Sequence, residues 1–151
     1  MNLSLKPSLV DWPVTHYVYV ARVGPFQKTA SKAWEDLQRL LPKIAEDNEI
    51  TGHLALYKPA ELEYRAGVSI GAKPRKLPEG VDYFKYKGGR YSQFVLTGPY
   101  SELPEASRRV FEAVERLRLT VRRAYYIENY VTDPATTPEK KAITEILVPT
   151  A

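Results

Sequence analysis

Cysteine is absent from this chain of 151 residues. Its absence excludes disulfide bonds, a thiol nucleophile and thiolate metal ligands. No apolar run approaches the roughly 18 residues of a membrane-spanning helix, and the segment from Met1 to Pro7 lacks the apolar core and the cleavage site of a signal peptide. Together these absences predict a cytoplasmic protein that makes no membrane contact.

Histidine is scarce as well, and the charge is modest. His16 and His53 are the two histidines, each at the start of a separate predicted strand, with no third ligand at metal-binding spacing. A net charge of +4 is small for a protein that coats nucleic acid. The sequence also lacks phosphate-binding loops, nucleophile elbows and a Ser/His/Asp set. We therefore expect no metal, no cofactor such as haem, and no direct contact with nucleic acid.

Tyrosine, in contrast, is abundant, because the chain has 11 tyrosines against 4 phenylalanines. A tyrosine combines a large apolar face with a hydroxyl at its tip, and concave binding surfaces favour that combination. The composition therefore indicates a surface that binds a small molecule.

The first part of the chain predicts a β-α-β-β unit. Alternating aromatic and β-branched residues over 16–23 predict a strand that Gly24-Pro25 ends. An apolar stripe over 29–44 predicts a helix that Pro42 closes or kinks early. Strands are expected at 53–57 and 64–70, and the Pro-, Gly- and Lys-rich segment 71–87 is expected to be a connector.

The second part repeats this order of elements. A strand over 90–97, a helix over 101–119 and strands over 124–131 and 142–148 are predicted. The segment from Tyr17 to the Gly24-Pro25-Phe26 corner recurs 74 positions later, from Tyr91 to Gly98-Pro99-Tyr100. The matching order favours a duplicated fold over a chance recurrence of Gly-Pro corners. We therefore expect one domain over 1–151, made of half-repeats at about 14–72 and 88–149.

Several motifs of the second half follow one another in a fixed order. They are Tyr91 to Tyr100, Leu103-Pro104-Glu105-Ala106, Glu128 to Pro134, Thr137-Pro138 and Thr144 to Pro149. This series resembles the GyrI-like effector-binding family, most strongly over residues 79–149. The family includes the ligand domains of multidrug-sensing transcription activators. Because the first strand is expected by about His16, we predict that a DNA-binding module is missing here.

The resemblance implies both a fold and a pocket. The fold would be α+β, with duplicated β-α-β-β units related by pseudo-twofold symmetry that form a curved antiparallel sheet with two helices. The central pocket would receive flat, apolar and often cationic molecules. An acidic residue of the last strand would lie at its base, and the matching residue here is Glu145.

Strand alternation gives a separate argument for such a pocket. Tyr126, Glu128 and Tyr130 share one strand face, so two rings flank a carboxylate. Glu145 shares its face with apolar neighbours, and burial of its charge would cost stability unless a cation or a hydrogen-bond donor compensates. An organic cation lying on tyrosine faces would do so. The predicted ligand-binding residues are Tyr17, Tyr19, Tyr57, Tyr64, Tyr91, Tyr126, Glu128, Tyr130 and Glu145.

The residues alone leave an alternative open, in which Glu145 pairs with an Arg or Lys of a neighbouring strand and the tyrosines pack as ordinary sheet residues. Trp34 and Phe111 belong to helical apolar stripes, so we expect them in the core. One basic cluster is expected to be a solvated helix end. It consists of Arg116, Arg118, Arg122 and Arg123.

Three functions compete at this point. The leading hypothesis is a stand-alone protein that senses or sequesters hydrophobic aromatic molecules, cationic ones included. The second is hydrolysis of strained, cyclopropane-containing electrophiles, an activity of some members of the resembled family, with Glu145 as general base and Tyr126 or Tyr130 orienting the leaving group. The third is a protein-interaction module of the gyrase-inhibitor type, which would give the chain a protein partner.

Overall fold

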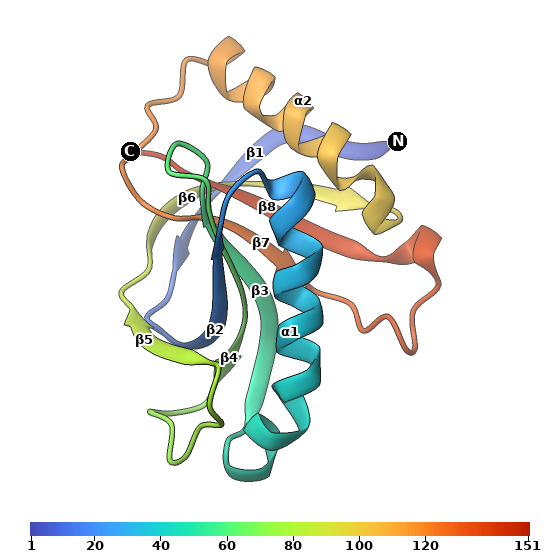
Figure 1. Cartoon of the computed structure of the whole chain (residues 1–151). Helices are drawn as coiled ribbons and strands as arrows, with labels where there is room; N and C mark the ends of the chain where they lie inside the picture. Colours follow the sequence, from blue (N-terminus) through green and yellow to red (C-terminus); the bar gives the residue numbers. More distant parts are fainter. The chain divides into compact units, whose positions relative to one another are not determined.

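The computed structural model describes residues 1–151 and divides into two compact units (Figure 1). Unit 1 comprises Met1–Trp12 and Gly89–Ala151, and unit 2 comprises Pro13–Gly88. Each unit holds four antiparallel strands and one α-helix. The predicted α+β class, the antiparallel pairing and the two helices are therefore confirmed.

Unit 2 contains the helix α1 and four strands in the order β3-β4-β2-β5. Its elements are β2 (Thr15–Val23), α1 (Phe26–Asp47), β3 (Ile50–Lys58), β4 (Glu63–Ile70) and β5 (Asp82–Tyr86). Arg22 of β2 forms an ion pair with Asp36 of α1, and Trp34 of α1 donates a hydrogen bond to Tyr64 of β4. The even-numbered residues of β2 and β4 therefore face α1, because side chains alternate along a strand.

The helix α1 continues through Pro42 to Asp47, so the expected early end of the helix at this proline is wrong. Proline removes only its own backbone donor, and Pro42 lies on the exposed side of the helix. The fully buried Ile44 holds the following turn against the sheet. Packing of the apolar stripe therefore outweighs the local helix-breaking preference.

Unit 1 has the strand order β1-β6-β8-β7. Its elements are β1 (Asn2–Trp12), β6 (Gly89–Thr97), the 3-10 turn Tyr100–Glu102, α2 (Leu103–Arg116), β7 (Tyr126–Tyr130), the 3-10 turn Glu139–Lys141 and β8 (Ile143–Pro149). The helix α2 lies along one face of these strands (Figure 1). The core between them contains Phe94, Leu96, Ala106, Val110, Ala113, Val114, Ile146 and Val148.

Two strands were not expected from the sequence. The first strand begins at Asn2 rather than near His16, and the segment taken as a connector contains β5. β1 pairs with β6, and β5 pairs with β2. Both are edge strands in their units, where one side needs no partner, so irregularities such as Pro7 at the register shift of β1 are tolerated.

With these edge strands included, the two units repeat one another. Unit 2 reads β5-β2-β4-β3 and unit 1 reads β1-β6-β8-β7 in the same sense. The Gly24 amide donates to the Leu62 carbonyl at 3.0 Å, and the Gly98 amide donates to the Ala142 carbonyl at 2.8 Å. Gly24 and Gly98 have φ of 136° and 157°, a conformation that favours glycine. The two corners are therefore equivalent parts of one repeated framework.

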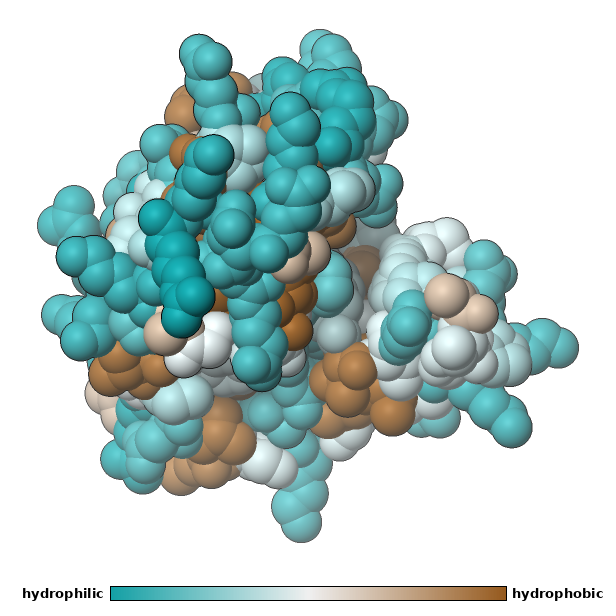
Figure 2. Space-filling model, turned by 90° about the horizontal axis from the view of Figure 1, so that it is seen from below, coloured by the Kyte–Doolittle hydropathy of each residue, from teal (hydrophilic) through white to brown (hydrophobic).

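No helix of the structure is long and apolar enough to cross a membrane. The large hydrophobic side chains that remain exposed come from different elements, for example Leu9 of β1, Val23 of β2 and Leu117 after α2. On the face shown in Figure 2, hydrophobic surface is broken into patches separated by hydrophilic side chains. Such scattered exposure is ordinary for a folded protein and marks no single large binding face.

Candidate functional site

The two sheet faces of unit 1 separate the acidic residues that the sequence singles out. Glu128 of β7 lies opposite Ile146 of β8, and the neighbouring pair is Asn129 with Glu145. Ile146 belongs to the core beneath α2, so Glu128 lies on the α2 side of the sheet and Glu145 lies on the other side. Within unit 1, the two carboxylates therefore belong to different sites.

Glu128 is a half-buried carboxylate without an ion pair. Its Oε1 accepts a hydrogen bond from the Tyr130 hydroxyl at 2.7 Å. Burial raises the pKa of the Glu128 carboxyl, and the Tyr130 hydrogen bond lowers it by less. A carboxylate in this state gains from any cation that reaches it.

Aromatic rings lie on the same face as Glu128. The Tyr126 ring meets the edge of Phe111 of α2, with centroids 5.7 Å apart and planes at 83°. The Tyr130 ring meets Tyr100, which begins the 3-10 turn before α2, with centroids 5.7 Å apart and planes at 73°. The strand alternation thus brings Tyr126, Glu128 and Tyr130 together, and the α2 side adds two more rings.

Glu145 has a polar partner on the opposite face. Its Oε1 accepts a hydrogen bond from Nδ2 of Asn129 at 2.8 Å, and it forms no ion pair with Arg or Lys. Its side chain is half-buried and shares the face of Val95, its partner in β6. The amide donor compensates part of the cost of burying this carboxylate. The predicted role of Glu145 at the base of a ligand pocket stays a prediction.

Tyr17 and Tyr91, equivalent residues of the two units, are fully buried. The Tyr17 hydroxyl lies 2.8 Å from the backbone carbonyl of Leu54 and 3.1 Å from that of Arg65, and these two acceptors share its single proton. The Tyr91 hydroxyl donates to the carbonyl of Tyr125 at 2.6 Å. Both hydroxyls therefore bind the protein's own backbone, and a structural role accounts for both tyrosines.

Tyr19 lies on the face of unit 2 that points away from α1, together with Arg65. The Arg65 guanidinium carbon lies 4.3 Å from the Tyr19 ring centroid and 4.9 Å from that of Phe84. Arg65 also pairs with Glu63 at 2.6 Å. Burial raises the pKa of Tyr19, and Arg65 partly opposes the shift. The cation on the Tyr19 ring is thus the guanidinium of Arg65, a residue of the protein itself.

Tyr57 and Tyr64 lie on the α1 side of unit 2. Phe26 of α1 contacts both rings, with centroids 5.7 Å from Tyr57 and 5.6 Å from Tyr64. Trp34 Nε1 donates to the Tyr64 hydroxyl at 2.8 Å. These two tyrosines pack beneath α1, so Trp34 does more than fill the core, because its indole also fixes Tyr64.

The histidines and the basic cluster have ordinary surroundings. His16 Nδ1 lies 2.8 Å from the Tyr83 hydroxyl, and no three His, Asp or Glu side chains are grouped closely enough to hold a metal ion. Arg122 donates to the carbonyls of Thr150 and Arg90. This arginine is therefore a structural link of unit 1, whereas Arg116 and Arg118 are exposed at the end of α2, as predicted, and Arg123 is exposed in the segment that follows.

Two residues beside these carboxylates are missing from the ligand contacts that the sequence predicts. Tyr100, which contacts Tyr130 on the Glu128 side, follows the repeated Gly98-Pro99 corner. Asn129 lies on the opposite face beside Glu145, and this register depends on how β7 and β8 pair. The recurrence of an aromatic residue after each Gly-Pro corner was the available signal for Tyr100.

The two units repeat one strand-helix-strand-strand framework, and unit 1 carries a half-buried carboxylate with aromatic neighbours. The chain belongs to the GyrI-like small molecule binding domain family, whose model matches residues 5–151. It is therefore a small-molecule-binding domain. No curated protein matches the chain in sequence.

Solved structures share the fold at low sequence identity. The EcmrR C-terminal domain has a TM-score of 0.78 and 15% identity, covering 100% of this chain and 99% of its own. SAV2435 bound to tetraphenylphosphonium has a TM-score of 0.71 and 16% identity, covering 96% and 93%. A hydrolase from Listeria innocua has a TM-score of 0.60 and 14% identity, covering 98% and 93%. These likenesses establish the fold alone.

Proposed function

We propose that this domain binds aromatic organic cations and that Glu128 is the anionic anchor of its site. One observation carries the proposal: Glu128 is half-buried, has a hydrogen bond from the neutral Tyr130 hydroxyl, and has no Lys, Arg or His partner. A protein that used this carboxylate only for stability would be expected to pair it. The unpaired state suits a ligand that brings the positive charge.

The surroundings of Glu128 favour a cation with an aromatic or apolar body. Tyr126 and Tyr130 lie on its face, and each ring can attract a nearby cation by roughly 0.5–2 kcal/mol. A delocalised organic cation also loses less hydration on burial than a compact ammonium or metal ion does. The structural relative SAV2435, solved with tetraphenylphosphonium, supports this choice of ligand class.

Glu128 suits this role better than Glu145, the anchor first expected. Glu145 accepts a hydrogen bond from the Asn129 amide and lies on the sheet face away from α2. Burial raises the pKa of Glu128, because the hydrogen bond from Tyr130 compensates its ionised form only in part in the free protein. Ligand binding would supply the remaining compensation.

Titration with tetraphenylphosphonium tests the proposal, with Glu128→Gln and Glu145→Gln as a matched pair. Both changes remove one carboxylate and keep the side-chain shape. We expect the Glu128 variant to lose at least about tenfold in affinity, because the cation would then lack its counter-charge in a partly desolvated site. The Glu145 variant should bind within about twofold of the parent protein. Equal losses in both variants, or no loss in either, would contradict the assignment.

Hydrolysis is a second candidate function, favoured by the raised pKa of Glu128 and by the Tyr130 hydroxyl at 2.7 Å. A carboxylate with a raised pKa can take a proton from water while the water oxygen bonds to a cyclopropane carbon. The strained C–C bond breaks, its electron pair moves to an electron-accepting group of the substrate, and that group is then protonated. Glu128 would then be the base in place of Glu145. Incubation with a cyclopropane-containing electrophile and product analysis test this, and substrate recovered unchanged at high protein concentration removes the candidate.

A further inference from the structure

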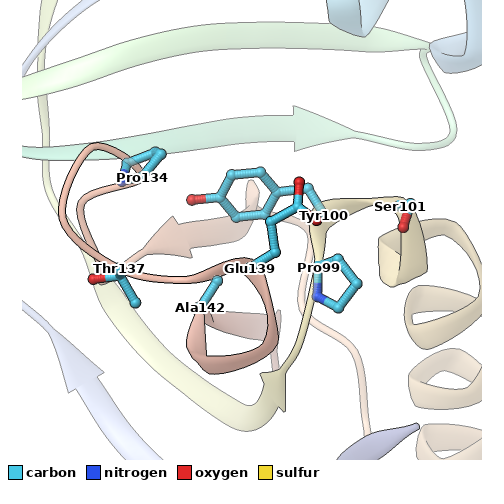
Figure 3. Close-up of a pocket in the computed structure, with 7 residues that line it drawn as sticks. All are labelled: Pro99, Tyr100, Ser101, Pro134, Thr137, Glu139 and Ala142. Atoms are coloured by element: carbon cyan, nitrogen blue, oxygen red, sulfur yellow. The ribbon is translucent and has the colours of Figure 1, made fainter.

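A pocket of about 240 Å³ lies in unit 1 beside the corner that precedes α2 (Figure 3). Three lining residues belong to the corner and its 3-10 turn, and four belong to the connection between β7 and β8. The Tyr100 ring extends toward the part of this connection that carries Pro134 and Thr137 (Figure 3). The lining residues are Pro99, Tyr100, Ser101, Pro134, Thr137, Glu139 and Ala142.

A difference in loop length between the units builds this pocket. In unit 2, residues 59–62 connect β3 to β4, whereas in unit 1 residues 131–142 connect β7 to β8. The two connections end at equivalent places, since Leu62 and Ala142 each accept the hydrogen bond from the corner glycine. The additional residues of unit 1 therefore form a wall opposite Tyr100. The short turn of unit 2 forms no such wall.

The lining combines apolar surface with negative charge. Pro99, Pro134, Ala142 and the ring of Tyr100 supply the apolar surface. The Glu139 carboxylate lines the pocket and forms neither an ion pair nor a side-chain hydrogen bond. Lys140 and Lys141 follow it in the chain and are exposed, as Glu139 is, but neither lysine lines the pocket.

Asp133 adds to this negative potential. Its Oδ1 accepts a hydrogen bond from the backbone amide of Ala135, which holds the carboxylate against the backbone of the connection between β7 and β8. Burial raises the pKa of the Tyr100 hydroxyl, and the nearby charge of Asp133 raises it further. Tyr100 therefore remains neutral at ordinary pH and presents a π face to the pocket.

We propose that this pocket is a second ligand site of the domain, which takes a small organic ammonium ion on the Tyr100 ring with Glu139 as the counter-charge. The volume suits a ligand with one ring or a short branched chain. The pocket differs from the Glu128 site, because neither Glu128 nor Tyr126 contributes to its lining, although Tyr100 borders both. Tyr130 connects the two, because its ring contacts Tyr100 and its hydroxyl donates to Glu128.

Phenyltrimethylammonium is a suitable probe, followed by amide chemical shifts in the folded, full-length chain. We expect shifts at the Gly98 to Glu102 corner and along residues 133–142. Tyr100→Ala should weaken binding by roughly 2- to 30-fold, the range of a cation on an aromatic ring. Glu139→Gln should weaken it by roughly two- to fivefold, and added salt should remove most of that difference.

Two controls make the test specific. Lys140→Gln changes a charge in the same loop but removes a cation, so it should leave the affinity unchanged or raise it slightly. The neutral analogue tert-butylbenzene should bind more weakly than the cation, because it cannot use Glu139.

Either of two results would overturn the proposal. One is a titration in which phenyltrimethylammonium saturates its effect on other residues but causes no chemical-shift changes at the corner or in the loop. The other is a loss of phenyltrimethylammonium binding in Glu128→Gln as large as that in Tyr100→Ala, which would assign the probe to the Glu128 site. Failure of the Glu128 proposal would look different. The affinity for tetraphenylphosphonium would then be unchanged by Glu128→Gln, while phenyltrimethylammonium would still shift the loop signals.

Discussion

The two units differ at one equivalent position that faces the helix, where unit 2 has bonds to its helix and unit 1 has an unpaired hydroxyl. In unit 2, Arg22 lies opposite Tyr64 in the sheet, and both bond to α1. In unit 1 the equivalent pair is Leu96 opposite Thr144. The Thr144 hydroxyl is buried without a hydrogen-bond partner. At this position unit 2 bonds its sheet to its helix, whereas unit 1, which carries Glu128, does not.

The other sheet face shows the same contrast in its charges. Arg65 of β4 lies opposite Ala21 of β2, and Glu145 of β8 lies opposite Val95 of β6, 74 positions after Ala21. Arg65 is therefore the counterpart of Glu145, with the opposite charge. Arg65 has a carboxylate and two rings as partners, whereas Glu145 has one amide. Duplication kept the backbone framework, and the side chains diverged.

The largest loss of stability is expected at Gly67 in unit 2, where the packing against Tyr17 leaves no space for an added methyl group. A Cβ added at Gly67 would lie 2.4 Å from the Tyr17 ring, which cannot move because its hydroxyl bonds two carbonyls. Gly67→Ala should lower the free energy of unfolding by about 3 kcal/mol, as overpacking of a core does. Denaturant titration measures this. Gly71→Ala, where the nearest atom is 3.9 Å away, is the control, and an equal loss there would refute the explanation.

Removal of the two equivalent hydroxyls compares the units directly. Tyr17→Phe and Tyr91→Phe each remove one buried O–H donor from backbone carbonyls. A lost buried hydrogen bond should cost about 1 kcal/mol, so the two variants should lose similar amounts. Thermal or denaturant unfolding of both variants measures the losses. A loss in only one of them would mean that the two hydroxyls are not equivalent.

Two substitutions at the next equivalent position should act in opposite directions. Thr144→Val removes a buried hydroxyl that has no partner, so it should raise the free energy of unfolding by about 1 kcal/mol. Tyr64→Phe removes the acceptor of the Trp34 indole and should lower it by about the same amount. Equilibrium unfolding under identical conditions gives both values. The same sign for both changes would show that the contrast between the units is not energetic.

The smallest effect on stability concerns Glu128 itself. Because burial raises its pKa, the folded state keeps this proton to a higher pH than the unfolded chain does. The contribution to stability is thus present at acidic pH and is lost as the pH rises through the raised pKa. Glu128→Gln should therefore be up to about 1 kcal/mol more stable than the parent at neutral pH, with less difference at pH 4. A variant that is less stable at neutral pH would contradict this reasoning.

The sequence predicts those elements whose pattern is strong over several turns or residues. The stripes around Leu37 and Val110 gave both helices, and the alternation around Tyr17 and Phe94 gave two central strands. The sequence pattern did not predict the edge strands β1 and β5. One side of an edge strand needs no regular pairing, so its residue pattern is weak. The distant partner of an edge strand also leaves no local signal.

The sequence predicts which residues of the candidate site share a face within one strand. It does not predict how the residues of two strands lie relative to one another. Period-two alternation puts Tyr126, Glu128 and Tyr130 on one face. The separation of Glu128 from Glu145 depends on the register of β7 with β8, and a shift of one residue would reverse every side chain. The connection over residues 131–142 does not fix that register in the sequence, as a two-residue hairpin would. The side occupied by Glu145 therefore required the structure.

The most direct test of the central claim is the titration of the Glu128 carboxyl by NMR, with and without tetraphenylphosphonium, in protein labelled at glutamate. In the free protein its pKa should lie above the ordinary glutamate value, because burial penalises the charge. If Glu128 is the anionic anchor, saturation with the cation should lower that pKa, while the Glu145 signal changes little. A Glu128 pKa that is the same in the free and saturated protein would contradict the account.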